Sequence, residues 1–141
     1  MQVYWHATAS QRIKVADDIE SFYTDARLLA RICTNLEGIE LGLYEDLYDA
    51  EELKPILHHP LAKKINLHEI VIREGRMRVR IFGSIDGQTI LYLNLHCKNR
   101  EGGDYNHSIE TAYQRYQSIT PYGTDQKIKK SIRDFPFNPN R

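Results

Sequence analysis

Arginines occupy every second position in the middle of the chain and alternate there with apolar residues, in the run Arg76-Met77-Arg78-Val79-Arg80-Ile81. This period-two pattern is typical of a strand that buries one of its faces. A later run alternates leucines with polar residues and carries His96 and Lys98 at polar positions. If the apolar residues of both runs face a core, the arginines, His96 and Lys98 share the opposite face. Guanidinium and ammonium groups bind phosphate, and histidine exchanges protons near neutral pH, so this cationic face could bind a phosphate and transfer protons there.

The cationic face has two explanations. An antiparallel sheet usually has one solvated face, and arginines on it need no ligand. Like charges that lie side by side on a sheet destabilise it, however, and an anionic partner would explain why three arginines lie beside a histidine and a lysine. The pattern therefore favours RNA, DNA or phosphate as a partner over solvent alone.

The strands that would position this face follow one another within residues 63–98. Two turn signals, Glu74-Gly75 and Asp86-Gly87, divide this segment into three strands and predict an antiparallel meander. A short apolar stretch at residues 2–7 predicts a further strand at the N-terminus.

Helical patterns lie on both sides of the meander. Apolar residues at three- and four-residue steps predict one long amphipathic helix, capped by Ser10 and ending near Gly38. A second helix is predicted over residues 43–53, a short one capped by Ser108, and another within residues 125–133. The expected fold class is α+β: an N-terminal strand, two helices, a three-stranded antiparallel meander that completes one small sheet, and short C-terminal helices.

The composition bounds the class of protein. At 141 residues the chain is long enough for one domain with a single core. It carries 19 basic and 19 acidic residues, and a net charge of zero argues against a general nucleic-acid coat. The charges are unevenly distributed, since residues 16–52 have a balance of −9 and residues 62–80 a balance of +4. A chain with this dipolar distribution can orient on an anionic surface.

Targeting and metal signals are weak throughout the sequence. No apolar run is long enough to span a bilayer, and the first residues do not follow a signal-peptide pattern, so we expect no membrane contact and a cytoplasmic location. Cys33 and Cys97 are far apart, predict no disulfide and are expected to be buried. His58 and His59 are adjacent but have no acid or cysteine at ligand spacing. We therefore expect no metal and no cofactor.

Five motifs follow one another between residues 67 and 115: Leu67-His68-Glu69-Ile70, Gly75-Arg76-Met77-Arg78-Val79-Arg80-Ile81-Phe82, Asp86-Gly87, Leu93-Asn94-Leu95-His96-Cys97-Lys98-Asn99 and Ser108-Ile109-Glu110-Thr111-Ala112-Tyr113-Gln114-Arg115. Their order and spacing resemble the toxins of the RelE/ParE superfamily, in particular the HigB-like branch and its phage-derived relatives. Ile70 and Asn99 stand where that family usually has basic residues. The resemblance implies a RelE-like toxin domain over residues 1–117, followed by a basic C-terminal extension over residues 118–141.

The resemblance also implies an activity. Such toxins belong to type II toxin–antitoxin modules and cleave mRNA on the ribosome without a metal, which inhibits translation. The ribose 2′-hydroxyl attacks its own 3′-phosphate, a reaction that requires a base, cations for the growing phosphate charge and an acid for the leaving 5′-oxygen. The implied partners are a cognate antitoxin protein, the ribosome and mRNA.

Candidate site residues follow from the motifs and from the cationic face. For catalysis we expect Arg78 as the transition-state stabiliser, His96 as acid or base, Lys98 as a further charge or base, Tyr105 to stack on a base or orient the hydroxyl, and His68 and His107 in reserve. The charges expected to contact the RNA backbone without reading its sequence are Lys63, Lys64, Arg73, Arg76, Arg80 and Arg100.

Two other functions remain open. ParE-type relatives inhibit DNA gyrase by binding and need no catalytic side chains, so such a protein would tolerate the loss of His96 and Lys98. A small α+β binding module with a merely solvated basic face is the other alternative. That module would keep its activity and its partner if Arg78 were changed to glutamate.

Overall fold

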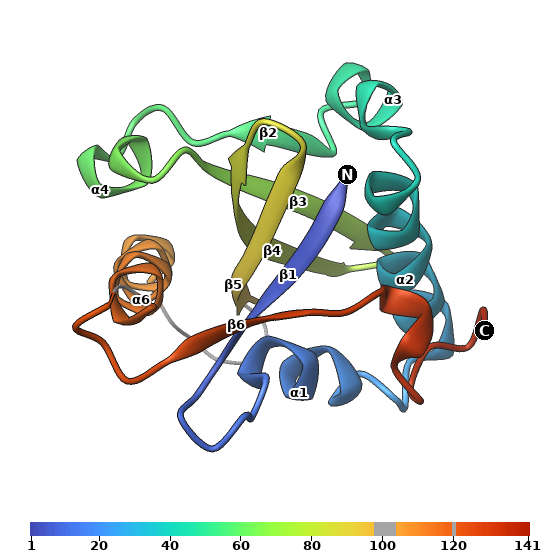
Figure 1. Ribbon diagram of the computed structural model, residues 1–141. Helices are drawn as coiled ribbons and strands as arrows, with labels where there is room; N and C mark the ends of the chain where they lie inside the picture. The colour runs from blue at the N-terminus through green and yellow to red at the C-terminus, as the bar shows by residue number, and fades with distance from the viewer. Residues whose placement is uncertain (98–103, 120) are drawn as a thin grey trace.

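A computed structural model of the chain describes residues 1–97, 104–119 and 121–141. Within these residues the strands form one six-stranded mixed sheet in the order β2-β3-β4-β5-β1-β6 (Figure 1). The strands are β1 (Gln2–Ala7), β2 (Leu53–Pro55), β3 (Leu67–Glu74), β4 (Met77–Asp86), β5 (Thr89–His96) and β6 (Gln126–Lys129). The helices are α1 (Lys14–Glu20), α2 (Ala26–Glu40), α3 (Tyr44–Asp49), α4 (Pro60–Lys64), α6 (Tyr105–Ser118) and a 3₁₀ turn, η1 (Ile132–Asp134).

The α+β class is confirmed, but the sheet is larger than the expected one. Strands β3, β4 and β5 pair antiparallel in succession, and β1 lies parallel to β5. Two strands that were not predicted complete the sheet, β2 beside β3 and β6 beside β1. They have three and four residues, so neither is long enough to show a strand period.

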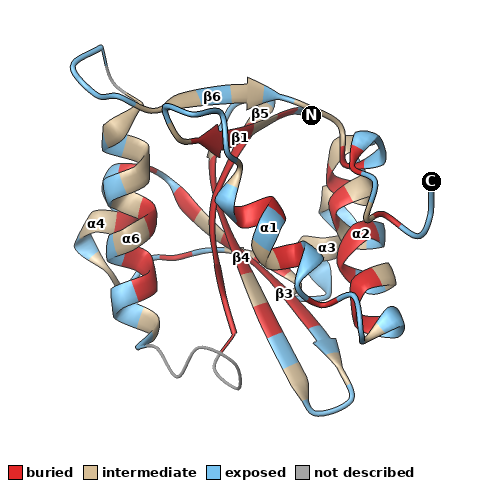
Figure 2. Cartoon of the chain, turned by 90° about the horizontal axis from the view of Figure 1, so that it is seen from below, coloured by how far each residue is buried: buried red, intermediate tan, exposed pale blue. Residues whose placement is uncertain are grey.

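Helices cover both faces of the sheet (Figures 1 and 2). Helices α1 and α2, with η1, cover one face, which we call the α2 face, and their core includes Trp5, Ile32 and Ile81. Helices α6 and α4 cover the other, the α6 face, where a smaller core includes Phe82, Leu93 and Ile109. No helix of the described residues is long and apolar enough to span a bilayer.

A β-bulge in β5 distributes the leucines of this strand over both faces of the sheet, which the alternating pattern did not predict. Phe82 pairs with Asn94 while Gly83 pairs with Tyr92, so β5 holds one extra residue, Leu93, at this point. Leu91 and Leu93 therefore contribute to the α6 core, whereas Leu95 contributes to the α2 core. The expectation that all leucines of this strand share one face is wrong.

The helix boundaries also differ from the predicted ones. The expected single helix is divided into α1 and α2, because the Asp25 carboxylate accepts a hydrogen bond from the Leu28 amide (3.1 Å) and starts a new helix. Helix α6 begins before Ser108, since Asp104 caps it by accepting from the Asn106 amide (3.1 Å). The second predicted helix is shorter, as α3, and residues 125–133 form β6 and the start of η1 instead of a helix.

The segment after residue 117 packs onto the same core as the rest of the chain. Strand β6 pairs antiparallel with β1. The Trp5 indole donates a hydrogen bond to the Lys130 carbonyl (2.7 Å), and its ring lies edge-on to Phe135 (centroids 4.9 Å apart). Cys33 and Cys97 are both buried, as the sequence predicted.

Candidate functional site

The exposed part of the α6 face carries a pair of opposed arginines. Arg73 on β3 and Arg78 on β4 face each other directly across the hairpin, and both are exposed. Arg80 follows two residues later on the same face and is half-buried, with 23% of its side chain exposed. We call Arg73, Arg78 and Arg80 the arginine strip. It begins near the exposed tip of the β3–β4 hairpin (Figure 2) and leads toward α6.

The inner end of the arginine strip meets a cluster around Glu69, whose side chain is only 6% exposed. The Tyr105 hydroxyl donates a hydrogen bond to the Glu69 carboxylate (2.5 Å). Lys54 Nζ and Arg80 Nε each lie 3.5 Å from a Glu69 oxygen, which for Arg80 is an ion-pair contact without hydrogen-bond geometry. The Arg80 guanidinium also lies over the Tyr105 ring, 5.0 Å from its centroid. We call Lys54, Glu69, Arg80 and Tyr105 the Glu69 cluster.

Tyr105 is held in its neutral form at this position. Burial and the nearby Glu69 carboxylate raise the pKa of Tyr105 well above its usual value. The phenol therefore keeps its proton at neutral pH and acts as a hydrogen-bond donor, which suits an anionic oxygen. It cannot supply a phenolate base.

A cavity of about 280 Å³ opens beside the Glu69 cluster. Its walls include Lys54, Leu57, His58, Glu69 and Tyr105. The exposed His58 ring stacks on Tyr105, with centroids 5.8 Å apart and planes inclined by 17°. Because His58 is exposed and lines the cavity, a ligand there could exchange a proton with it.

Sequence reasoning did not select Lys54, His58 or Glu69 as site residues. Lys54 lies within the short strand β2, which no pattern predicted, and His58 follows that strand; Glu69 lies in an ordinary strand motif. His58 was considered only as a metal ligand. A buried glutamate between apolar strand residues was the one signal available, because buried carboxylates are rare unless they are paired.

His96 lies behind the Tyr105 ring. It pairs directly with Arg80 across β4 and β5, so the two share the α6 face as expected. It is only 3% exposed, its Nδ1 contacts the Ser108 hydroxyl (2.8 Å), and its ring lies edge-on to Tyr105 (5.9 Å, 84°). Because α6 covers it, His96 can orient Tyr105 but does not reach the cavity.

The remaining predicted residues lie apart from this cluster or outside the described residues. His68 lies on the α2 face beside Tyr48 (centroids 6.2 Å apart), where burial lowers its pKa. His107 is exposed and lies 3.9 Å from Glu110. The exposed bases Lys63 and Lys64 end α4, and Arg76 occupies the β3–β4 turn. Lys98 and Arg100 are not among the described residues.

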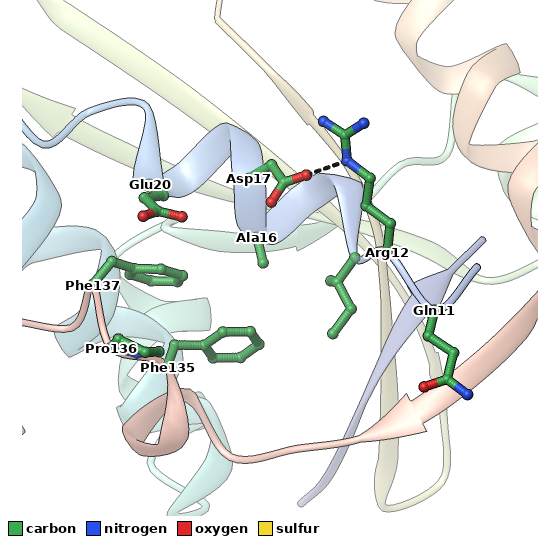
Figure 3. A pocket seen from close by; sticks show the side chains of 9 residues that line it. Gln11, Arg12, Ala16, Asp17, Glu20, Phe135, Pro136 and Phe137 are labelled. Atoms are coloured by element: carbon green, nitrogen blue, oxygen red, sulfur yellow. Dashed lines mark hydrogen bonds and ion pairs between the residues drawn. The ribbon is translucent and has the colours of Figure 1, made fainter. Parts of the chain in front are cut away.

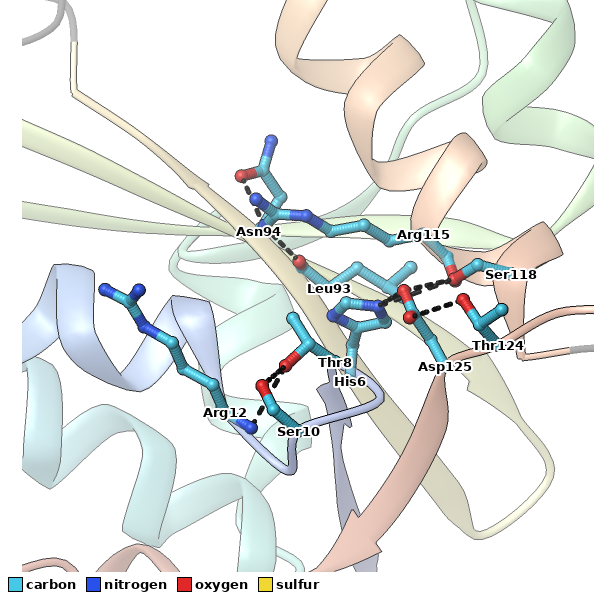
Figure 4. A network of polar contacts seen from close by, with 10 residues as sticks. All are labelled: His6, Thr8, Ser10, Arg12, Leu93, Asn94, Arg115, Ser118, Thr124 and Asp125. Carbon is cyan, nitrogen blue, oxygen red and sulfur yellow. Dashed lines mark hydrogen bonds and ion pairs between the residues drawn. The ribbon is translucent and has the colours of Figure 1, made fainter.

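A serine, a histidine and an aspartate also meet elsewhere, at the junction of β1, α6 and β6 (Figure 4). His6 Nε2 donates to Asp125 Oδ2 (2.8 Å), and the Ser118 hydroxyl lies 2.9 Å from the same oxygen. A hydrolytic triad needs the acid and the serine on different ring nitrogens, whereas here both are on the Nε2 side. His6 Nδ1 is buried and has no hydrogen-bond partner among the described residues, and the residue is 1% exposed. This arrangement ties β6 to the sheet and is not a nucleophilic site.

The same junction shifts two pKa values. Burial lowers the pKa of His6, because the imidazolium would leave a second N–H without an acceptor. Hydrogen bonds from His6 and Ser118 lower the pKa of Asp125. Behind it, Arg115 donates to the Leu93 carbonyl (2.8 Å) and anchors α6 on the bulge of β5.

Another cavity, of about 300 Å³, lies on the α2 face between α1 and the C-terminal segment (Figure 3). An exposed ion pair between Arg12 and Asp17 (2.6 Å), the Glu20 carboxylate and the Phe137 ring line it. The sheet separates this cavity from the arginine strip, so it does not belong to the candidate site.

Comparisons with models of protein families, with curated proteins and with solved structures find no match to this chain. Among the described residues, no three or more His, Cys, Asp or Glu side chains are arranged to hold a metal ion. The described side chains of the candidate site offer several groups for chemistry. These are two exposed guanidiniums, a third at the edge of a poorly hydrated cluster, a phenol donor, a carboxylate and an exposed imidazole.

Proposed function

We propose that the protein is the toxin of a type II toxin–antitoxin module, with a RelE-like arrangement of its sheet. It acts in the cytoplasm as a metal-independent endoribonuclease that cuts mRNA on the ribosome and inhibits translation. The observation that carries this proposal is the arginine strip, in which two opposed, exposed arginines lead to a half-buried arginine beside Tyr105 and Glu69.

The charges of the strip support a polyanionic ligand. Neither Arg73 nor Arg78 makes an ion pair with a described residue. Directly opposed like charges destabilise a strand pair, and consecutive phosphates of an RNA strand would neutralise both. Lys63, Lys64, Arg76 and Arg100 are the further backbone-contacting residues of this proposal.

The groups around the cavity support phosphoryl transfer within RNA. Arg78 and Arg80 bind the scissile phosphate. As negative charge grows on it, the Tyr105 hydroxyl shifts its one donated hydrogen bond from the Glu69 carboxylate to a phosphate oxygen. His58 and Lys98 exchange the protons, one as the base and the other as the acid. The 2′-oxygen forms a bond to phosphorus while the bond to the 5′-oxygen breaks. The base takes the 2′-hydroxyl proton, the acid protonates the leaving 5′-oxygen, and the products are a 2′,3′-cyclic phosphate and a 5′-hydroxyl. His96 positions Tyr105 and does not touch the substrate.

A second candidate function is inhibition by binding alone, as for a ParE-type DNA gyrase inhibitor. One observation favours it: two of the expected catalytic groups are engaged inside the fold, His96 with Ser108 and Tyr105 with Glu69. The arginine strip would then contact a partner without cleavage. In both cases a cognate antitoxin that covers the strip with an acidic segment would block the activity.

Primer extension on a reporter mRNA in a translating extract tests the proposal. The variants are Arg78→Gln, Tyr105→Phe and, as a control with the same charge change, Arg27→Gln on the exposed surface of α2. We expect cuts within the reading frame that need ribosomes, disappear in Arg78→Gln, weaken in Tyr105→Phe and persist in Arg27→Gln. Cuts without ribosomes would indicate a nuclease of free RNA. Growth arrest of cells that express the protein, without cuts in the extract, would favour the binding function. The absence of both cuts and growth arrest would refute both functions.

A further inference from the structure

A second hollow lies on the α6 face, at the other end of α6 from the Glu69 cluster. Two adjoining cavities of about 220 and 200 Å³ share Leu91, Tyr116 and Lys127 in their walls. Tyr4 of β1 and Asp86 at the end of β4 line one of them, and Ile119 lines the other. We call this hollow the tyrosine groove.

The tyrosine groove combines an apolar floor with aromatic walls. Leu91 is 9% exposed and forms part of the α6 core, against which Tyr4, Tyr116 and Ile119 are partly buried. The hydroxyls of Tyr4 and Tyr116 make no hydrogen bond to a described residue. Partly buried tyrosine rings with free polar tips suit a flat ligand that stacks on them and forms hydrogen bonds at its edges.

One cation and one anion flank these rings, and they are not paired with each other. Lys127 Nζ lies over the Tyr4 ring, 4.8 Å from its centroid, and this contact holds the ammonium at the wall of the groove. Neither Lys127 nor Asp86 forms an ion pair with a described residue. The ammonium is therefore available to a phosphate, and the carboxylate can accept hydrogen bonds from a ribose hydroxyl or a base amino group.

We propose that the tyrosine groove binds one nucleotide, with its base against the tyrosine rings, its phosphate on Lys127 and its ribose or base edge at Asp86. The inference rests on the proposed function, because RNA is the ligand that supplies nucleotides to both sites. Tyr105 and Tyr116 are eleven positions apart on α6, which corresponds to about 16 Å of helix. The groove is thus a second subsite that holds a substrate nucleotide away from the scissile phosphate.

Titration of the full chain with adenosine and uridine 5′-monophosphates tests the groove directly, with ribose 5-phosphate as the ligand that lacks a base. The readout is the shift of ring resonances in protein with labelled tyrosines. We expect Tyr4 and Tyr116 to shift with the nucleotides and not with ribose 5-phosphate, and the shifts to disappear in Lys127→Gln. Lys130→Gln, whose ammonium lies over Phe135 on the α2 face, and Tyr122→Leu, at a fully exposed ring, are the matched controls. Equal losses in Lys127→Gln and Lys130→Gln would overturn the proposal, since they would indicate general attraction.

Binding of a short single-stranded RNA separates this inference from the proposed function. Tyr116→Leu keeps the apolar bulk in the core and removes the stacking ring, and should weaken RNA binding by about 5- to 150-fold. Lys127→Gln should lower the slope of log affinity against log salt by about 0.7. If free nucleotides do not bind but both variants weaken RNA binding, the ligand is a nucleotide within RNA. RNA binding that is abolished by Arg78→Gln and unchanged by Tyr116→Leu would refute the groove and leave the arginine strip. Nucleotide binding in the groove without any mRNA cleavage would support the tyrosine groove and refute the proposed cleavage activity.

Discussion

Replacing Arg78 by glutamine should make the protein more stable and, at the same time, weaken its binding to RNA. Arg73 and Arg78 are exposed and directly opposite each other on β3 and β4. In the free protein they repel, and glutamine keeps most of the side chain while it removes one charge. A change that raises stability and lowers binding at one position is expected where a surface is built for a ligand rather than for the fold.

The size of both effects follows from the geometry. Like charges directly opposite each other on a sheet cost about 0.2–1 kcal/mol, and solvent screening keeps an exposed pair toward the lower end. For a protein of 141 residues this corresponds to an increase in melting temperature of about 1–3 °C. On the binding side, the loss of one phosphate contact on a single strand should reduce the salt slope of RNA affinity by about 0.7.

Thermal melting in 20 mM and 500 mM NaCl, together with RNA binding over the same salt range, measures the two effects. The gain in melting temperature should be larger at low salt, because high salt screens the repulsion in the wild type. Arg27→Gln should change neither the RNA affinity nor its salt slope, since Arg27 lies on α2, across the sheet from the strip. If Arg78→Gln melts below the wild type, the reasoning is refuted, because Arg78 would then stabilise the free protein through a favourable contact.

Three further predictions concern the Glu69 cluster, the β1–β6 junction and the end of α6. Glu69→Gln removes the carboxylate beside the half-buried Arg80 and should lower the free energy of unfolding in urea by about 1.5–3 kcal/mol. It should also raise RNA affinity, because a phosphate can replace the lost carboxylate; destabilisation without this gain would contradict the arrangement. Burial lowers the pKa of His6, so the unfolded chain binds a proton there more readily, and stability should fall as the pH drops below about 6.5. Urea midpoints at pH 7.5 and 5.5 should show a smaller loss in His6→Gln, and a wild type that gains stability on acidification would disprove the assignment. Gly123→Ala would place a Cβ 1.8 Å from the Ser118 carbonyl oxygen at the end of α6 and should lower the free energy of unfolding by about 1–3 kcal/mol. In Gly38→Ala the new Cβ meets nothing within 4 Å, so this control should raise the free energy of unfolding by about 0.5–1 kcal/mol. Similar urea midpoints for the two alanine variants would argue against the contact at Gly123.

Strong local patterns predicted the central elements correctly. The alternation after Arg76 gives β4, and the two turn signals coincide with Gly75 and Gly87, which both have a φ of +58°. That backbone region favours glycine, so the turns could be placed from sequence alone. The break between α1 and α2 could not be placed, because the capping by Asp25 competes with an apolar period that runs through it. Strand β6 depends on pairing with β1, far away in the sequence, and its four residues carry no signal of their own.

The candidate site could be predicted only in part, because the bulge of β5 has no signature in the sequence. Leu91, Leu93 and Leu95 alternate without interruption, so the pattern alone assigns all three to one face. The extra residue turns Leu91 and Leu93 to the α6 face and leaves His96 where the alternation placed it. Those two leucines provide the apolar floor on which α6 packs. A face that the sequence presents as fully solvated is therefore covered by a helix over its inner half.

That cover gives the candidate site its chemical character. Beyond the N-terminal end of α6, Arg73 and Arg78 remain in water. Where α6 covers the sheet, Glu69 and His96 are almost fully buried. Arg80 lies at the boundary and contacts both the Tyr105 ring and the Glu69 carboxylate. Electrostatic interactions are strong in a poorly hydrated region and weak in water, so a phosphate that moves from Arg78 to Arg80 passes from weak attraction to strong polarisation. A reaction on that phosphate would therefore be accelerated at the N-terminal end of α6, beside Arg80, and not over the cationic face as a whole.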